Sequence, residues 1–305
     1  MVAYMFGRMA LRIQSAMEYL MTYGWAILII AVVLGALFGL GFFNSASLAP
    51  KVTAGSCQIY RPNGPGTTTF INTEGVCNNE LPQYVANFNR SEGYIITGTA
   101  GLPGGSAARS VFAWVSFTGN TAVLCDIPGN LYNCYAYGYG TTATNERSQL
   151  GIYEGNVIMD ADNNGFPSSL RVPPVGWHFI GYTYASGSST VTLYMDGQSQ
   201  TGSLPDGALA TVLSSSYIGS QLGGTGSFFT GSLANIQVYN TSLSSNEVTA
   251  LYQEGIGGDP VLLNSLVAWW PLNGNSNDYS GNQNNGVSEN SFFFTSSWTS
   301  GYSAP

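Results

Sequence analysis

The chain carries few charged residues for its length. Of its 305 residues only 8% are Asp, Glu, Lys or Arg, Lys51 is the only lysine, and the formal net charge is −8. Proteins that bind nucleic acid neutralise phosphates with clustered lysine and arginine, and this chain has no such cluster. We therefore expect no nucleic-acid partner, and we expect a surface built from uncharged polar and small residues.

Histidine is almost absent, which bears on metal binding. His178 is the only histidine, and the four cysteines include no C-x-x-C pair. Structural zinc sites use four Cys or His ligands, commonly in closely spaced pairs. The sequence therefore argues against a zinc site, and it offers His178 no obvious nucleophile or acid as a catalytic partner.

One long apolar segment lies near the N-terminus. Residues 26–43 contain no charge, and the stretch Gln14–Phe43 would rise about 45 Å as a helix, more than the hydrocarbon core of a bilayer requires. Arg8 and Arg12 precede this stretch, and Glu18 lies close to its start. The two arginines place the N-terminal end of the helix in the cytoplasm.

This arrangement resembles the class III signal peptide and N-terminal helix of archaeal type IV pilin-like proteins, which include pilins and archaellins. In that family a short basic leader is removed just before the helix, and the fifth mature residue is usually glutamate. Cleavage between Ile13 and Gln14 places Glu18 at that position, although the family prefers a small residue where Ile13 stands. The resemblance implies a prepilin peptidase-like protease and membrane assembly machinery as partners during export.

Two features of the segment suit assembly of a helical homopolymer. The Glu18 carboxylate is costly to bury unless a positive partner lies nearby, and the resemblance implies the N-terminal amine of a neighbouring subunit. Gly35 and Gly39 form a small-x-x-x-small pair that allows close approach of helices. A simple membrane anchor and a secretory signal cut near residues 44–46 remain the alternatives.

The rest of the chain predicts a mainly β fold. From Tyr84 onward, short alternating segments lie between turn signals, as in an all-β sandwich. Residues 110–118 place Val111, Ala113, Val115 and Phe117 on one face. The predicted strands at 177–185 and 190–196 are adjacent, and Asp196-Gly197 predicts a tight hairpin turn. A further strand at 233–239 is expected to face inward with Ala234, Ile236 and Val238.

A short helix follows that strand. Residues 244–247 read as a capping box, Val248, Leu251 and Tyr252 share one helical face, and Gly255 is placed to end the helix. The order of strands and helix, ending in GSLANIQVYN and LSSNEV, resembles the second half of a laminin G-like, concanavalin A-like jelly roll. The resemblance covers roughly residues 84–258.

The C-terminal residues 265–286 resemble the opening strand and loop of the same jelly-roll family, yet too few residues follow for a second sandwich. We expect Leu266–Leu272 to complete a sandwich of the same chain or of a neighbouring subunit, unless it is a loosely packed tail. The expected organisation is a leader at 1–13, a filament-core helix at 14–44, a hinge at 45–54, a disulfide-stapled loop region at 55–83, the sandwich at 84–258 and the completing segment at 259–305.

Features typical of exported proteins occur in the predicted head. An even number of cysteines favours two disulfides, and the closest pairs are Cys57–Cys77 and Cys125–Cys134, although four cysteines allow three connectivities. The sequons at Asn89 and Asn240 are candidate glycosylation sites.

The predicted head lacks a motif for hydrolysis and has a weak one for calcium binding. Hydrolases of the concanavalin A-like family often carry E-x-D-x-x-E along one strand, and that spacing is absent, so we expect no enzyme and no catalytic residue. No cofactor is expected to be required. Asp160, Asp162 and Asn164 resemble half of a calcium loop, and an Asx-rich turn is the simpler explanation. A second oxygen-rich loop lies at 278–285. Tyr135, Tyr137 and Tyr139 could stack on sugars or form a tyrosine-rich sheet face.

Together these features predict a structural subunit of an extracellular pilus-like or archaellum-like filament, held in the cytoplasmic (inner) membrane before assembly. Its lectin-like head would serve adhesion or motility and is a candidate for binding surface glycans. The alternative is a lectin-like binding protein that is singly anchored at the cell surface.

Overall fold

The computed structural model describes residues 21, 23–36, 57–62, 68–73, 82, 84–89, 93–117, 133–224, 226–289 and 292–295. The chain divides into two compact units, residues 1–53 and residues 54–305. Each unit is described by itself.

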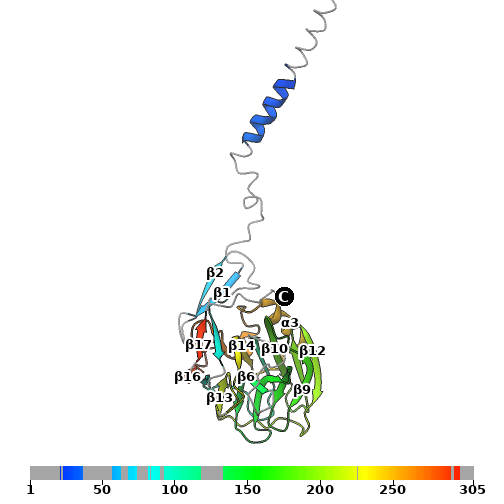
Figure 1. Ribbon diagram of the computed structural model, residues 1–305, viewed down its shortest axis with the longest axis vertical. Helices are drawn as coiled ribbons and strands as arrows, with labels where there is room; N and C mark the ends of the chain where they lie inside the picture. The colour runs from blue at the N-terminus through cyan, green and yellow to red at the C-terminus, as the bar shows by residue number, and fades with distance from the viewer. Residues whose placement is uncertain are drawn as a thin grey trace, which may run out of the picture. The chain divides into compact units, whose positions relative to one another are not determined.

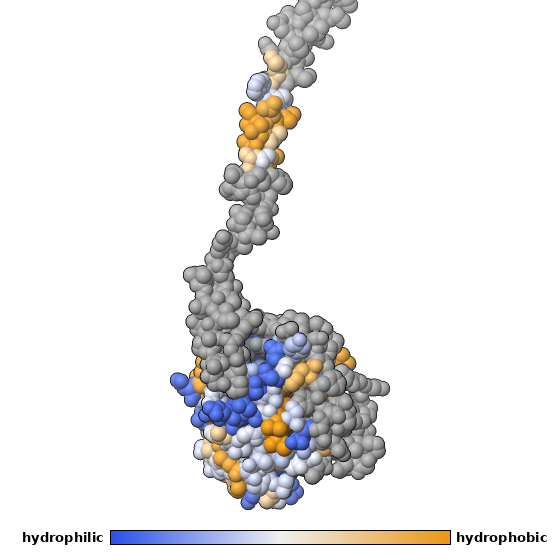
Figure 2. All heavy atoms as spheres, turned by 90° about the vertical axis from the view of Figure 1, so that its left-hand side faces the viewer, coloured by the Kyte–Doolittle hydropathy of each residue, from blue (hydrophilic) through white to orange (hydrophobic). Residues whose placement is uncertain are grey.

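In the first unit, residues 21 and 23–36 are helical, inside the predicted helix 14–44. Their large apolar side chains are exposed, from Met21 at 66% to Leu34 at 45%, and Figure 2 shows apolar residues gathered on the visible face of the helix. Gly35 has no neighbouring atom within 4 Å of the place a Cβ would take. None of the helices that the structure describes is both long and apolar enough to cross a membrane. Ile13, Gln14, Glu18 and Gly39 lie outside the described residues.

The second unit is built on two antiparallel sheets that pack face to face (Figure 1). The larger, eight-stranded sheet runs in the order β12-β11-β10-β5-β14-β3-β17, and β15 also pairs with β14. Its strands are β3 (Val85–Asn89), β5 (Arg109–Ser116), β10 (Trp177–Tyr184), β11 (Thr190–Met195), β12 (Gln198–Ser203), β14 (Thr230–Tyr239), β15 (Leu266–Trp270) and β17 (Phe292–Thr295).

The smaller sheet has seven strands in the order β16-β4-β13-β6-β7-β8-β9. Most of its strands carry β-branched or aromatic residues between turn residues, as the sequence predicts for an all-β sandwich. They are β4 (Tyr94–Thr97), β6 (Asn133–Gly140), β7 (Arg147–Tyr153), β8 (Asn156–Asp160), β9 (Phe166–Arg171), β13 (Ser215–Ile218) and β16 (Val287–Glu289).

Strand β14 organises the larger sheet because three strands pair with it. Its first half pairs with β3 and its second half with β15, so these two strands share one edge, while β5 occupies the other edge. The C-terminal strand β15 therefore completes the sheet of its own chain, with Ile236 opposite Trp270. A short 3-10 turn, η1 (Leu263–Ser265), leads into β15.

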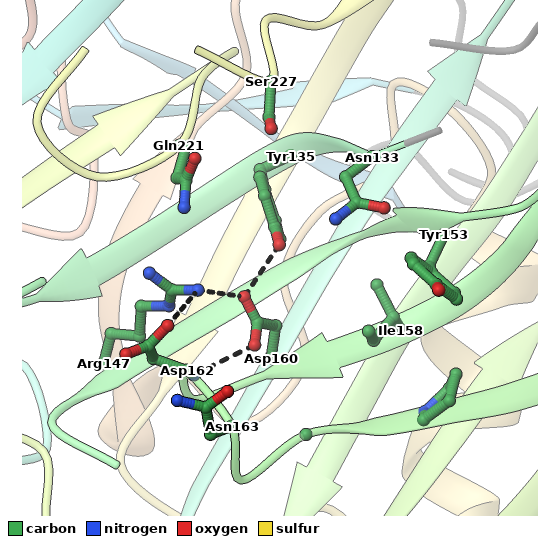
Figure 3. A pocket seen from close by; sticks show the side chains of 12 residues that line it. Asn133, Tyr135, Arg147, Tyr153, Ile158, Asp160, Asp162, Asn163, Gln221 and Ser227 are labelled. Atoms are coloured by element: carbon green, nitrogen blue, oxygen red, sulfur yellow. Dashed lines mark hydrogen bonds and ion pairs between the residues drawn. The ribbon is translucent and has the colours of Figure 1, made fainter. Parts of the chain in front are cut away.

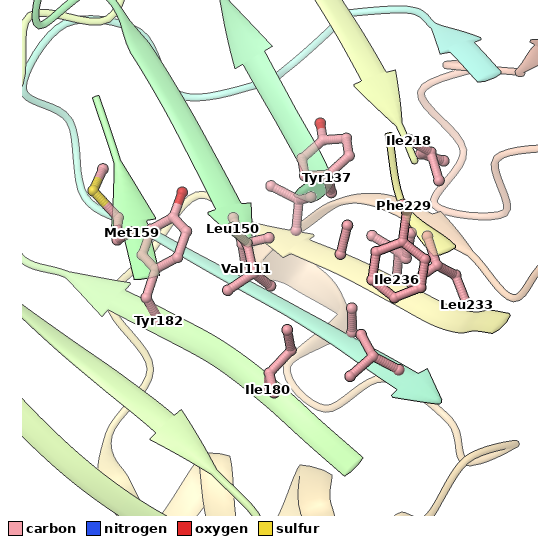
Figure 4. Close-up of a cluster of buried hydrophobic side chains, with 14 of the residues drawn as sticks. Val111, Tyr137, Leu150, Met159, Ile180, Tyr182, Ile218, Phe229, Leu233 and Ile236 are labelled. Carbon is pink, nitrogen blue, oxygen red and sulfur yellow. The ribbon is translucent and has the colours of Figure 1, made fainter. Parts of the chain in front are cut away.

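The main core lies between the two sheets (Figure 4). The predicted inward face of β5 is confirmed, because Val111, Ala113, Val115 and Phe117 are all in this core. The alternate residues Phe112 and Trp114 belong to a second cluster on the opposite face of the same sheet. Both faces of β5 are therefore buried, as expected for a central strand that is covered on both sides.

Helix α3 (Ser245–Glu254) is part of the cover of that second face. Its predicted capping box is present, because Ser244 accepts from the Glu247 N–H and the Glu247 side chain accepts from Ser244 N. Gly255 ends the helix with a positive φ of 84°. The buried residues Val248 and Leu251 face the cluster that contains Trp114, Phe179 and Trp269.

Two local predictions were wrong. Ala234 faces the second cluster rather than the core between the sheets, because β14 is irregular at Asn235, whose φ is +49°. The region 55–83, predicted to be loop, contains the antiparallel pair β1 (Cys57–Pro62) and β2 (Thr68–Thr73). Threonine and isoleucine in β2 favour a strand. The surrounding Gly and Pro residues are typical of loops and led to the prediction of a loop.

The second oxygen-rich loop, around Asp278, serves the fold. Its carboxylate accepts hydrogen bonds from the Trp269, Ser280 and Asn284 N–H groups and from the Ser280 hydroxyl at 2.9 to 3.0 Å. The Asn284 side chain is 1% exposed and bonds both the N–H and the carbonyl of Ala100. The oxygens of Asp278 and Asn284 are thus used within the protein, and they fix the loop beside β15.

Candidate functional site: a polar cavity on the outer face of the smaller sheet

A cavity of about 550 Å³ lies on the face of the smaller sheet that points away from the core (Figure 3). Along β7, Leu150 and Ile152 point into the core, while Arg147 and Tyr153 line the cavity. The period-two alternation of a strand therefore separates the two environments. The lining residues are Asn133, Tyr135, Arg147, Tyr153, Ile158, Asp160, Asp162, Asn163, Gly165, Pro167, Gln221 and Ser227.

Arg147 joins the two acidic residues of the cavity. Its Nη2 lies 2.7 Å from Oδ2 of Asp160 and 3.2 Å from Oδ1 of Asp162. The Arg147 side chain is 7% exposed and that of Asp160 is 11% exposed, so this pair is shielded from solvent. The second oxygen of Asp160 accepts from the Asp162 N–H at 2.9 Å, which fixes the turn after β8.

Tyr135 completes this network from the neighbouring strand. Its hydroxyl donates to Oδ2 of Asp160 at 2.7 Å. Burial, together with the nearby charge of Asp160, raises the pKa of Tyr135 far above its usual value, so the phenol stays protonated and acts as a donor. The ring lies over Gly151, where an added Cβ would stand 2.6 Å from the ring carbon Cδ1. Glycine at this position thus allows the ring to lie close to β7.

The loop at 219–229, between β13 and β14, forms one side of the cavity. The Gly219 N–H donates to the Ala136 carbonyl at 3.0 Å, and the Tyr135 N–H donates to the Ser227 carbonyl at 3.4 Å. These bonds coincide with the irregular pairing of β6 and β7 between Tyr135 and Tyr137. They hold Ser227 and Gln221 at the edge of the cavity.

Several polar atoms at this site have no partner among the described residues. Nε of Arg147 and Oδ1 of Asn133 are buried and accept or donate no hydrogen bond there. Gln149 on β7, which is fully buried and does not line the cavity, also has two polar atoms without a partner among the described residues. Buried polar atoms usually have a partner, so their concentration here marks the site as unusual.

The structure separates the three tyrosines that the sequence places together. Tyr137 and Tyr139 are fully buried in the core, whereas Tyr135 faces the cavity, because the strand is irregular between Tyr135 and Tyr137. The expectation of one tyrosine-rich face was therefore wrong. A second aromatic wall is supplied by Tyr153, which lies on the other side of Asp160 from Arg147 (Figure 3).

Of the three residues predicted as calcium ligands, Asp160 and Asp162 lie together and Asn164 does not join them. Asp160 and Asp162 both face the Arg147 guanidinium, which occupies the place of a cation between them. Asn164 points elsewhere, since its Oδ1 accepts from the Asp206 N–H and its Nδ2 donates to Asn145. Among the described residues no cluster of three or more His, Cys, Asp or Glu side chains could hold a metal ion.

The other predicted residues lie away from the cavity. His178 pairs with Asp196 at 2.6 Å within the larger sheet. Cys134 is fully buried and disulfide-bonded, whereas Cys77 and Cys125 lie outside the described residues. The backbone of Cys57 begins β1. The two sequons lie at strand ends: Asn89 ends β3, and the exposed Asn240 follows β14.

Sequence reasoning missed Arg147, Tyr153, Gln221 and Ser227. They come from β7 and from the loop before β14, and only pairing across the sheet brings them together. Arg147 alone could have been predicted from the sequence. It is a charged residue inside a strand of a chain with few charges, and a buried charge usually has a partner of opposite charge.

Comparison with known proteins identifies the class of fold. Residues 89–249, just over half of the chain, match the concanavalin A-like lectin/glucanases superfamily profile. The chain therefore belongs to this superfamily. No curated protein matches the chain by sequence.

The chain is also similar to solved structures. A protein of Bacteroides ovatus ATCC 8483, with a provisional assignment as carbohydrate-binding, matches with a TM-score of 0.54 and 14% identity, over 72% of this chain and 62% of that chain. The heptameric SAP-like pentraxin of Limulus polyphemus matches at 0.47 and 12%, over 70% and 95%. Domains LG4-5 of the mouse laminin alpha1 chain match at 0.40 and 11%, over 62% and 48%.

Proposed function

We propose that the second unit binds carbohydrate in the cavity between β6, β7, β8 and the 219–229 loop. The supporting observation is the cavity itself: it combines tyrosine rings with amide, hydroxyl, carboxylate and guanidinium groups on a rigid sheet. Ring faces pack on the apolar face of a sugar, while the polar groups exchange hydrogen bonds with its hydroxyls. The superfamily includes lectins, which fits this proposal.

A binding role agrees better with this geometry than hydrolysis does. Glycoside hydrolysis uses two carboxyl groups on opposite sides of the bond, one of them protonated. Here Asp160 and Asp162 both face the same guanidinium of Arg147, and Tyr135 donates to Asp160. Release of shorter sugars from a glycan panel would favour the hydrolase alternative.

The first test is glycan-array binding by the full-length protein in detergent. Replacing Tyr153 with alanine removes one ring wall and should weaken binding about tenfold. Tyr84→Ala is the matched control, since Tyr84 is exposed and does not line the cavity. Equal binding by the Tyr153→Ala variant and the wild type would place the binding surface elsewhere.

A second proposal concerns the N-terminal helix, which we infer to form the core of an extracellular filament that displays this domain. The supporting observation is that residues 21 and 23–36 are helical and that their large apolar side chains are exposed. A helix of this kind requires an apolar environment, either lipid or neighbouring helices. The class III signal resemblance around Gln14 and Glu18 favours neighbouring helices, whereas a single membrane anchor is the alternative.

Processing and imaging separate these two possibilities. A filament subunit should start near Gln14 after removal of the leader, and material sheared from cells should contain filaments with axial helices. Glu18→Ala should abolish filaments in that case, because the carboxylate would lose its pairing with a neighbour's amine. Membrane-bound monomers that retain Arg8 and Arg12 would support a single anchor and leave carbohydrate binding as a separate property.

A further inference from the structure

The charges that line the cavity restrict the kind of carbohydrate it can hold. Among the described residues that line the cavity, Arg147 is the only cationic one, while Asp160 and Asp162 are both acidic. One positive and two negative groups give a formal charge of −1. The two carboxylates therefore outweigh the positive charge of the guanidinium. The cavity has no surplus positive charge with which to bind a carboxylate or sulfate.

The position of the pairing strengthens this restriction. Both carboxylates approach the same nitrogen, Nη2, at 2.7 and 3.2 Å. Nε of Arg147 is buried and has no partner among the described residues. An anion accepting from the Arg147 guanidinium would lie within a few ångströms of both aspartates, in a shielded site where like charges repel more strongly than in water.

A neutral hydroxyl meets these constraints. Its oxygen can accept from the guanidinium of Arg147, and its proton can be donated to a free lone pair of an oxygen on the lining. Oδ1 of Asn133, elsewhere on the lining, is a second polar atom without a partner in the described part of the chain. The lining thus offers both donors and acceptors to the hydroxyls of an uncharged sugar.

The same arrangement disfavours a bridging calcium ion. A cation between Asp160 and Asp162 would have to displace the Arg147 guanidinium, which already neutralises them. A third predicted ligand, Asn164, is committed to Asn145 and to residues 206–207. We therefore expect side chains, and not a calcium ion, to contact the sugar directly.

We propose that the cavity selects uncharged glycans over acidic ones and binds them without calcium, an inference that rests on the proposed carbohydrate-binding function. Arg147 supplies the donor to a sugar hydroxyl, and Asp160 with Asp162 excludes uronates, sialates and sulfated sugars.

The test compares paired oligosaccharides that differ only at C6, where the neutral member has a hydroxymethyl group and its partner a carboxylate. Gluco- and galacto-oligosaccharides and their uronate counterparts are titrated into the full-length protein in detergent. We expect the neutral member to bind about tenfold more tightly, in excess EDTA as in calcium. The preference should shrink as salt is raised, because ions screen the repulsion.

Two variants test the assignment of the residues. Asp162→Asn removes one negative charge from a side chain that is 29% exposed, and it leaves Arg147 paired with Asp160. This variant should bring uronate binding to within about threefold of neutral binding. Asp206→Asn makes the same charge change at an exposed position outside the cavity and should leave the preference unchanged.

The possible results distinguish failure of the proposed selectivity from failure of carbohydrate binding itself. Uronates that bind as tightly as neutral sugars, or binding that EDTA abolishes, would overturn the selectivity while carbohydrate binding stands. Failure of every glycan to bind would overturn carbohydrate binding itself. If Asp162→Asn does not fold, the salt dependence of the wild-type preference still decides the question.

Discussion

Trp269 donates its indole N–H to Oδ1 of Asn235 over 2.8 Å, which fixes the C-terminal strand β15 to the irregular point of β14. The same oxygen accepts from Nε2 of Gln237 at 2.9 Å, and Nδ2 of Asn235 donates to the Gly258 carbonyl at 2.8 Å. The Asn235 backbone N–H donates to the Pro271 carbonyl. One residue thus joins β14, β15 and the turn after α3.

Replacing Asn235 with alanine should lower the free energy of unfolding by about 3 kcal/mol. Alanine loses the three side-chain hydrogen bonds, and it also disfavours the φ of +49° found at this position. Asn235→Gly tolerates that conformation and loses only the hydrogen bonds, so it should cost less. Urea unfolding measures both, and equal losses in the two variants would show that backbone conformation contributes nothing.

Trp270 tests whether the C-terminal segment is part of the folded unit. Its side chain is fully buried, packs against Tyr137 with ring centroids 5.2 Å apart, and donates its Nε1–H to the Asn284 carbonyl. Trp270→Ala should therefore destabilise the protein by about 3 to 5 kcal/mol in a thermal or urea melt. The exposed Leu262, just before β15, offers a control, because Leu262→Ala removes an apolar side chain that is 45% exposed. A melt unchanged by Trp270→Ala would indicate a loosely attached tail.

Much of the sandwich could be predicted because local patterns fix it. The alternation around Val111 gave the correct inward face of β5, and the Ser244–Glu247 box placed the start of α3. The Asp196-Gly197 turn also joins β11 to β12 as predicted, with φ values of 46° and 79°. Each of these features depends on residues that are close together in the sequence.

The cavity could not be predicted in the same way. Arg147 meets Asp160 only because β7 pairs with β8, and Ser227 reaches Tyr135 only because the loop folds back over β6. Ala234 was assigned to the wrong face since a single left-handed residue, Asn235, interrupts the alternation of β14. Such breaks depend on hydrogen bonds between distant segments, which a pattern within one strand does not contain.

His178 should make stability depend on pH near neutrality. Its Nδ1 lies 2.6 Å from Oδ2 of Asp196, and its Nε2 lies 3.1 Å from the Val175 carbonyl, so both ring nitrogens face acceptors. Burial lowers the pKa of His178, but the hydrogen bond and charge of Asp196 outweigh it, and the net pKa lies above 6.5. The folded state therefore binds the proton more tightly than the unfolded state does.

The sign of the effect follows from this difference. The stabilisation is fully present below pH 6.5, the value for the unfolded chain, and is lost as the pH rises through the higher pKa of the folded state. Urea midpoints measured across this range should fall with pH for the wild type. His178→Gln should flatten the profile there, because His178 is the only histidine of the chain. A wild-type midpoint that rises across this range would contradict the assignment.

The Arg147 pair should contribute to stability as well as to the cavity. Arg147→Gln would leave the Asp160 carboxylate, 11% exposed, with no cation beside it, at a cost of about 3 to 5 kcal/mol in the free energy of unfolding. Arg171→Gln, at an exposed position of β9, is the matched control and should change stability little.

A double-mutant cycle isolates the Arg147–Asp160 interaction. Asp160→Asn keeps Arg147 beside Asp162 and should cost less than Arg147→Gln does, because one carboxylate still balances the guanidinium. Combining the two substitutions should restore about 2 kcal/mol relative to the sum of the single losses, since the second change removes the uncompensated charge that the first one leaves. Additive losses in urea unfolding would mean that solvent already screens the pair. The shielded cavity of net negative charge, on which the proposed glycan selectivity depends, would then have to be abandoned.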